Sequence, residues 1–190
     1  MKRLILLTLA VLAPFSAADE KRDPVEDTLR EAWAEYKTGN YDVTREKLAE
    51  VMKMLEEKDA EKIEELLPKE LDGWEGETLQ RDDLGAVGGG LSISRLYEDD
   101  KKKVTVKVVK NSPLMKTLIP LLANEQLIEL SGRKTHRISG ETAVMDGPKK
   151  LQMVLDGRIY VELAGSGEAE EKDIVSLARK LDLRALEKIK

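Results

Sequence analysis

The segment that most constrains the fold is residues 151–164, LQMVLDGRIYVELA, in which two alternating runs flank Asp156-Gly157. A turn dipeptide of this kind between alternating apolar residues is a strong short-range signal for a β-hairpin. The apolar residues all occupy odd positions: Leu151, Met153, Leu155, Ile159, Val161 and Leu163. Side chains alternate between the two faces of a strand, so these residues can form one continuous apolar face only in a suitable register.

The length of the turn decides that register. A two-residue loop would divide the apolar set between the two faces of the sheet. A loop of odd length instead pairs Met153 with Ile159. Leu151 then lies opposite Val161, and the whole set shares one face. We therefore predict a type I turn with a G1 bulge, in which Gly157 supplies the left-handed conformation.

The flanking sequence predicts an α+β fold, in which an N-terminal α-hairpin precedes an antiparallel sheet. Period-two segments at 75–81, 91–98, 103–110, 133–139 and 141–146 join the 151–164 hairpin. Helical periodicity marks two helices before Pro68, one at 114–130, one at 168–181 and a last short helix capped by Asp182. These patterns predict about six strands with helices packed on one face. The expected division is a helical hairpin at 19–68 and an α+β domain at 69–190.

Residues 1–18 have the layout of a secretory signal peptide. Lys2 and Arg3 precede the apolar run 4–13, which is too short for a stable membrane span. Ser16-Ala17-Ala18 offers small residues for cleavage before the chain turns polar. We therefore expect a periplasmic or secreted protein with no transmembrane span after signal removal.

The expected mature chain is acidic and contains no cysteine. Removing residues 1–18 takes away two basic residues and no acidic ones, which changes the formal net charge from −5 to −7. Nucleic-acid binding depends on clustered cations that neutralise phosphates, so this charge argues against a nucleic-acid partner. Without disulfides, the fold must be stabilised by its core alone.

The N-terminal helices resemble one tetratricopeptide-type helical hairpin. The likeness is carried by Ala32-Trp33, Tyr36, Gly39-Asn40-Tyr41 and Leu48. The chain departs from that pattern at Thr44, where a small alanine is usual. Such repeats need about three copies to bury a core, and the pattern occurs once here, so a generic antiparallel helix pair is the simpler interpretation.

Residues 114–130 form the most unusual segment, because they are apolar on more than one side. Pro120 should kink this helix or divide it in two. A helix that is apolar all round is normally a core helix, but it can also cover a ligand pocket or offer a docking surface. The candidate contact residues are Leu114, Met115, Leu118, Ile119, Leu121 and Leu122. We expect them to act together with a mobile glycine loop at 85–90, which lacks the Gly-Lys-Ser/Thr of a phosphate-binding loop.

The chain offers little material for catalysis. His136 is its only histidine, so neither a multi-histidine metal site nor a Cys/His pair is available. Gly165-x-Gly167 precedes a predicted helix, but Glu170 stands where dinucleotide binding needs a further glycine. We therefore predict no cofactor and no catalytic residue. A hydrolase that uses two paired carboxylates is left as an alternative, because the chain has 37 acidic residues.

From residue 67 onward the order of elements is similar to small exported bacterial α+β domains of the PsbP-like kind. The likeness is carried by Ser139-Gly140-Glu141-Thr142-Ala143, the 151–161 hairpin, Gly165-x-Gly167 and Leu181-Asp182-Leu183. The resemblance implies an accessory or binding role and transfers no catalytic residue. We expect a non-enzymatic protein of the cell envelope that contacts a partner through 114–130. The alternative is a carrier of a lipid or other hydrophobic small molecule between that helix and the sheet.

Overall fold

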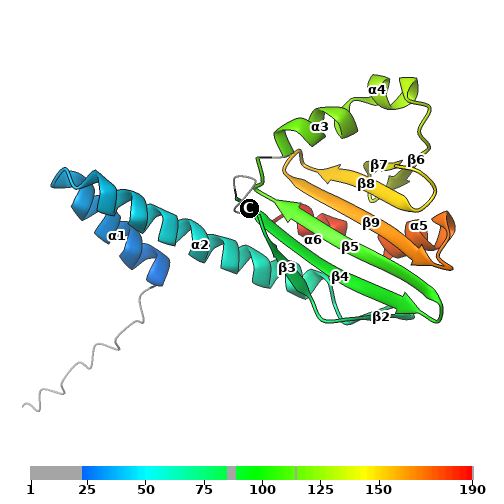
Figure 1. Cartoon of the computed structure of the whole chain (residues 1–190), viewed down its shortest axis with the longest axis horizontal. Coiled ribbons are helices and arrows are strands. Elements are labelled where there is room, and N and C mark those ends of the chain that lie inside the picture. The colour runs from blue at the N-terminus through cyan, green and yellow to red at the C-terminus, as the bar shows by residue number, and fades with distance from the viewer. Residues whose placement is uncertain (1–22, 85–88, 114, 190) are drawn as a thin grey trace, which may run out of the picture. The chain divides into compact units, whose positions relative to one another are not determined.

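The computed structural model describes residues 23–84, 89–113 and 115–189 of the 190-residue chain (Figure 1). The predicted signal peptide at 1–18, most of the predicted glycine loop at 85–90, and Leu114 lie outside the described residues. The chain forms two compact units, Met1–Val51 and Met52–Lys190. The second unit begins before residue 68, the predicted end of the hairpin, because Ala60, Ile63 and Leu67 are fully buried in its core.

The first unit contains a helical hairpin, as predicted. Helix α1 (Pro24–Lys37) begins at Asp23, whose carboxylate accepts a hydrogen bond from the Val25 amide at 3.0 Å. Pro24 suits the first helical position because no intrahelical hydrogen bond is lost there. Gly39, with φ +80°, turns the chain into α2 (Tyr41–Leu66).

The second unit is built on one nine-stranded antiparallel sheet, which confirms the α+β class and exceeds the predicted six or so strands. The strands are β1 (Glu70–Leu71), β2 (Trp74–Gly76), β3 (Gln80–Asp83), β4 (Leu91–Asp99), β5 (Lys102–Lys110), β6 (Thr135–Ile138), β7 (Glu141–Met145), β8 (Lys150–Leu155) and β9 (Ile159–Gly167). Their order is β1-β2-β4-β5-β9-β8-β7-β6, with β3 also paired to β4. The predicted strand at 75–81 is broken into short pieces, and β1 and β2 are joined at Asp72-Gly73, where both φ angles are positive.

The loop of the β8–β9 hairpin has an odd number of residues, as predicted, but each residue pairs with a partner two positions later in the chain than predicted. Leu155 pairs with Ile159, Met153 with Val161, and Leu151 with Leu163. The loop therefore has three residues, and all six odd-numbered apolar residues are buried in one core. The predicted type I turn is also wrong. Asp156 and Gly157 both have positive φ, as in a type I′ turn, and the Arg158 amide donates to the Leu155 carbonyl at 3.0 Å.

Helices α5 (Glu171–Lys180) and α6 (Leu183–Glu187) cover this apolar face together with the C-terminal part of α2. Alternate residues of β5, such as Val104, Val106 and Val108, continue the same face. The predicted cap of α6 is present, since the Asp182 carboxylate accepts from the Ala185 amide at 2.9 Å.

A buried ion pair joins α2 to the end of β5. Lys110 follows the apolar alternation of β5 and so faces the core, where its side chain is only 3% exposed. Its ammonium lies 2.6 Å from the Asp59 carboxylate. A buried ammonium without a partner would be strongly unfavourable, so Asp59 fixes where this part of α2 packs on the sheet.

Helices cover both faces of the sheet, which differs from the predicted arrangement on one face. Val154 and Tyr160 alternate with the core residues of β8 and β9, so they point to the opposite side. There they pack with residues from α3 (Met115–Ala123) and α4 (Glu125–Leu130) in a second, smaller apolar cluster. The predicted helix at 114–130 is divided in two, but not at Pro120, which lies inside α3. The break falls at Asn124, whose side chain caps α4 by accepting a hydrogen bond from the Leu127 amide.

The start of α5 is held by a carboxylate. Asp173 is buried, and its carboxylate accepts from the Glu170 amide at 3.0 Å and from the Lys102 ammonium at 2.9 Å. Burial raises the pKa of the Asp173 carboxyl, but the amide and the ammonium more than offset this and hold the pKa below its ordinary value. A depressed pKa in the folded state means that the ionised group stabilises the fold above its unfolded pKa and stops doing so as the pH falls through its folded pKa.

We therefore expect Asp173→Asn to lower the free energy of unfolding by about 1 kcal/mol at pH 7. The difference from wild type should begin to shrink as the pH falls below about 4, where this carboxyl takes up a proton in the unfolded chain, and it should be lost below the depressed pKa of the folded state. Urea unfolding at pH 7 and pH 3 measures both quantities, with Arg179→Gln on the exposed side of α5 as the control. A deficit that stays constant between the two pH values would contradict this account.

Candidate functional site: an aromatic face on the helical hairpin

The two helices of the first unit pack through small side chains. Thr28 and Ala32 of α1 are buried, as is Thr44 of α2. The Thr44 hydroxyl donates to the Asn40 carbonyl at 2.8 Å, so this residue satisfies its own polar group where the tetratricopeptide-type pattern has alanine. Small side chains at the contact between α1 and α2 allow the two helices to lie close together. The large side chains of the hairpin point away from this contact.

Three aromatic side chains of the hairpin are exposed. Trp33 is 58% exposed, Tyr36 is 52% exposed, and Tyr41 is 55% exposed. The other two tyrosines and the second tryptophan, all in the second unit, are buried: Trp74, Tyr97 and Tyr160. The chain has only six Trp and Tyr residues in total, so half of them are displayed on one short hairpin.

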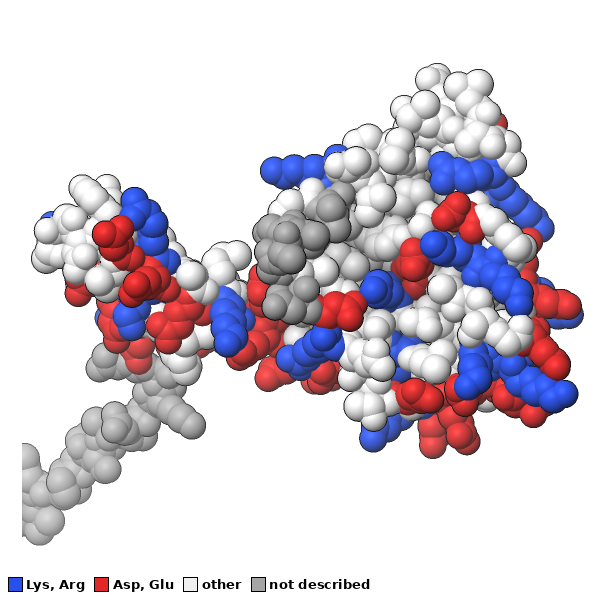
Figure 2. Space-filling view, viewed as in Figure 1, with Lys and Arg blue, Asp and Glu red and all other residues white. Residues whose placement is uncertain are grey.

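The exposed rings form a connected surface, which we call the aromatic face: Leu29, Trp33, Tyr36, Tyr41 and Leu48. The Trp33 and Tyr36 rings stack with centroids 5.7 Å apart, and the Tyr36 and Tyr41 rings are 6.0 Å apart. The Lys37 ammonium lies 5.2 Å from the Trp33 ring centroid, within cation–π range. Figure 2 shows uncharged atoms gathered over the hairpin where α1 turns into α2, with acidic and basic side chains beside them.

A groove runs through the aromatic face between the two helices. It has a volume of about 280 Å³, and its walls are almost entirely apolar. Ala32 and Thr44 form its floor, while Leu29 and Leu48 lie on either side. Large exposed apolar patches on water-soluble domains are typical of surfaces that bind a protein or a ligand. Tyrosine and tryptophan are also the residues that contribute most to binding at protein interfaces.

The sequence pattern placed Trp33 and Tyr36 on the apolar side of a helix but did not identify this exposed face. Trp33 and Tyr36 share the helical periodicity of Ala32, which is the residue that is buried. Periodicity shows that residues share a side of a helix, but not whether anything covers that side. The available signal was the gathering of three of the chain's six Trp and Tyr residues between positions 33 and 41.

The predicted contact residues of 114–130 are divided between the interior and the surface. Met115 and Leu122 are buried against the sheet, and Ile119 packs beside them. Leu118 is half-buried, and Leu121 is exposed, whereas Leu114 lies outside the described residues. The segment still exposes Leu121, Leu127 and Leu130, and Leu130 of α4 is the most exposed of its large apolar side chains.

His136 contacts an acid, but the arrangement is that of a surface ion-pair cluster. Its Nε2 lies 2.8 Å from Glu171 Oε1, and the Lys134 ammonium lies 2.6 Å from the same oxygen. The hydrogen bonds from Lys134 and then His136 lower the pKa of the Glu171 carboxyl. A pocket of about 320 Å³ adjoins His136, lined by Thr135, Arg137 and Thr142 among others. Among the residues that the structure describes, no three His, Asp or Glu side chains are placed to hold a metal ion.

Comparisons with protein-family models, with curated proteins and with solved structures found no match to this chain. The resemblances to a PsbP-like domain and to a tetratricopeptide-type hairpin therefore stay predictions. Within residues 23–84, 89–113 and 115–189, no helix combines the length and apolar character needed to cross a membrane.

Proposed function

We propose that this protein is a non-enzymatic binding protein that docks a partner through the aromatic face of its helical hairpin. The observation that carries the proposal is the contrast in exposure among its Trp and Tyr residues. Trp33, Tyr36 and Tyr41 are all more than half exposed, whereas their three counterparts in the second unit are buried. Leaving three large rings in water forgoes the stabilisation that their burial would give, which is consistent with a surface that is covered in a complex.

The geometry of the groove favours a helical partner segment. A shallow apolar groove between two antiparallel helices accepts the apolar side of an amphipathic helix, which contacts it with residues spaced three and four apart. Residues 23–51 contain eight acidic and four basic residues, a net charge of −4. A basic amphipathic helix would therefore complement both the shape and the charge of this hairpin.

The cellular setting that we propose is the envelope or the exterior of the cell, on the signal-peptide layout of residues 1–18. In that setting the protein would act as an accessory or assembly factor. A contact through 114–130 is less well supported, because Met115, Ile119 and Leu122 already pack on the sheet. A lipid carrier is also less well supported, because these residues and Tyr160 occupy the region between α3 and the sheet.

The test compares two matched surface variants in a pull-down from the exporting cells. Trp33→Ala/Tyr36→Ala removes rings from the aromatic face, and Leu121→Ala/Leu130→Ala removes two exposed leucines from the 114–130 segment. We expect the first variant to weaken binding of the captured partner at least about 30-fold, as loss of interface hot spots does. The second variant should bind as wild type does, and both should unfold within about 1 kcal/mol of it, because the residues are exposed.

If Leu121→Ala/Leu130→Ala weakened binding and Trp33→Ala/Tyr36→Ala did not, the contact would be assigned to 114–130. Retention of the partner by both variants would exclude either surface. Fluorescence of Trp33 offers an independent readout, because a partner that covers the ring should shift its emission to shorter wavelength, whereas the buried Trp74 should contribute a constant signal.

A further inference from the structure

An arginine lies on the buried face of the sheet, in the middle of β4. Residues of a strand alternate between its two faces, so Arg95 shares the core-facing side with Ile93 and Tyr97. Its partner on β5 is Val106. These three neighbours are fully buried, and Arg95 itself is only 5% exposed. A guanidinium keeps its charge throughout the physiological pH range, so the core of the second unit contains a permanent positive charge.

The hydrogen-bonding groups of this guanidinium are not satisfied by the described part of the chain. Nε and Nη1 of Arg95 are both buried, and neither has a hydrogen-bond partner among the described residues. Two carboxylates of neighbouring elements are paired elsewhere. Glu64 of α2 lies 2.7 Å from Arg81, and Asp72, beside β2, lies 3.0 Å from Lys180. Because an unpaired charge in an apolar interior is strongly unfavourable, we expect Arg95 to acquire a counterion.

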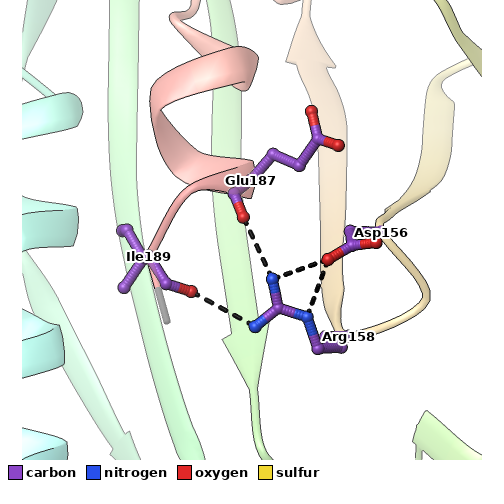
Figure 3. Close-up of polar contacts among 4 residues, drawn as sticks. All are labelled: Asp156, Arg158, Glu187 and Ile189. Carbon is purple, nitrogen blue, oxygen red and sulfur yellow. Dashed lines mark hydrogen bonds and ion pairs between the residues drawn. The ribbon is translucent and has the colours of Figure 1, made fainter.

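Two other cations of the second unit show how such a group is satisfied. The Lys110 ammonium, on the same face of the sheet, lies 2.6 Å from the Asp59 carboxylate. Arg158, at the β8–β9 turn, donates through Nε and Nη2 to the Asp156 carboxylate, and through Nη1 and Nη2 to two backbone carbonyls near the C-terminus (Figure 3). Arg95 is buried, as Lys110 is, but its Nε and Nη1 lack any such acceptor within the residues described.

The packing around Arg95 limits the size of the anion that it can hold. A Cβ atom on Gly76 would lie 2.7 Å from Cδ of Arg95 and 3.1 Å from Cε1 of Tyr97, so the backbone of β2 packs directly on the arginine stem. Burial raises the pKa of the Tyr97 hydroxyl to about 12, and the positive charge of Arg95 offsets part of this rise. The surroundings are therefore closely packed and apolar, which favours a monatomic anion over an organic carboxylate. Chloride loses its hydration shell more easily than the smaller fluoride ion does.

We propose that the buried face of the second unit binds one chloride ion, which accepts hydrogen bonds from the Arg95 guanidinium and neutralises its charge. The route of entry is the junction of β2 and β3, where the exposed residues Glu77 and Thr78 join two short strands that both pair with β4. Chloride then does for Arg95 what Asp59 does for Lys110. This site is separate from the aromatic face and does not depend on the proposed partner.

The first experiment follows urea unfolding of the full chain while chloride replaces fluoride at constant ionic strength. An anion that binds only the folded state stabilises it by mass action. The unfolding equilibrium constant at a fixed urea concentration should therefore fall about tenfold between fluoride alone and about 200 mM chloride. A general salt effect would have the opposite sign, because strongly hydrated anions are excluded from protein surfaces and favour the folded state.

The matched variants change one arginine each. Arg95→Met removes the buried cation and keeps a side chain of similar length, so the stabilisation by chloride should be lost. In fluoride alone this variant should be at least as stable as the wild type, because the unpartnered charge is gone. Arg45→Met is the control: the Arg45 side chain is 73% exposed on α2, and this variant should keep the full chloride effect.

A second experiment locates the ion without any variant. Crystals of the wild-type protein grown in bromide should show an anomalous scattering peak beside the Arg95 guanidinium. The proposal is overturned if the wild type is no more stable in chloride than in fluoride, if Arg95→Met keeps the chloride effect, if Arg45→Met loses it, or if water and no halide lies beside Arg95. If Arg95→Met does not fold, the wild-type titration and the bromide peak decide the question.

Discussion

Asp59→Ala is expected to lower the free energy of unfolding by about 3–5 kcal/mol, because it leaves the Lys110 ammonium buried without its partner. Lys110 is only 3% exposed, and it lies at the end of β5 between β4 and β9. The Asp59 carboxylate at 2.6 Å is the acceptor that makes this burial tolerable. Urea unfolding followed by circular dichroism measures the loss.

The double variant Asp59→Ala/Lys110→Met separates a buried charge from a mere loss of contact. Removing both charged groups takes away the unpaired ammonium, so most of the lost stability should return. Glu64→Ala serves as the matched single-site control, since it breaks the exposed pair with Arg81 and should cost no more than about 1 kcal/mol. If Asp59→Ala proved as mild as Glu64→Ala, the buried pair would not fix α2 to the sheet.

Leu163→Ala should lower the free energy of unfolding by about 2–5 kcal/mol. Leu163 is fully buried, and it lies in β9 between Leu151 of β8 and Val106 of β5. Truncating it would remove buried methyl groups at the centre of the main apolar cluster and leave a cavity that neighbouring strands cannot close. Thermal and urea unfolding of the variant measure this cost.

The next residue of the same strand provides the control. Ala164 points to the opposite face of the sheet, and Ala164→Ser should change the free energy of unfolding by less than about 0.5 kcal/mol. Equal effects of the two substitutions would mean that the two faces of β9 are equally buried. This would contradict the placement of the odd-numbered apolar residues of the hairpin on one buried face.

Much of the second unit follows from local patterns in the sequence. The odd-numbered apolar residues of 151–164 predict that one face is buried, and it is. The alternation around residue 106 and the polar residues 98–102 predict β4, β5 and the turn between them, as observed. Asp23 and Asp182 predict the starts of two helices, because capping depends on a side chain and a backbone amide only a few residues apart.

One detail that the sequence pattern does not specify is local, and another depends on atoms far apart in the chain. The hairpin has a three-residue loop in which Asp156 and Gly157 both adopt positive φ, and a shift of two residues in the pairing preserves the face while changing every pair. The pairing of Lys110 with Asp59 joins residues 51 positions apart. A lysine at an apolar position of an alternating strand was the only local sign of it.

The candidate site shows the same limit most clearly. The periodicity of α1 groups Ala32, Trp33 and Tyr36, yet the structure buries the first and exposes the other two. The segment 114–130 was predicted from its composition as a contact surface, and its packing on the sheet leaves only part of it available.

The sequence by itself determined the α+β class, the shared face of the late hairpin and the ends of several helices, since each depends on neighbouring residues and on the period of a strand or a helix. Only the tertiary structure decided which apolar faces are covered: α3 and α4 cover the part of the second face of the sheet that carries Val144, Val154 and Tyr160, whereas the described residues of the first unit leave Trp33, Tyr36 and Tyr41 exposed. The physical reason is that burial is a property of two surfaces in contact, and a pattern along one segment describes only one of them.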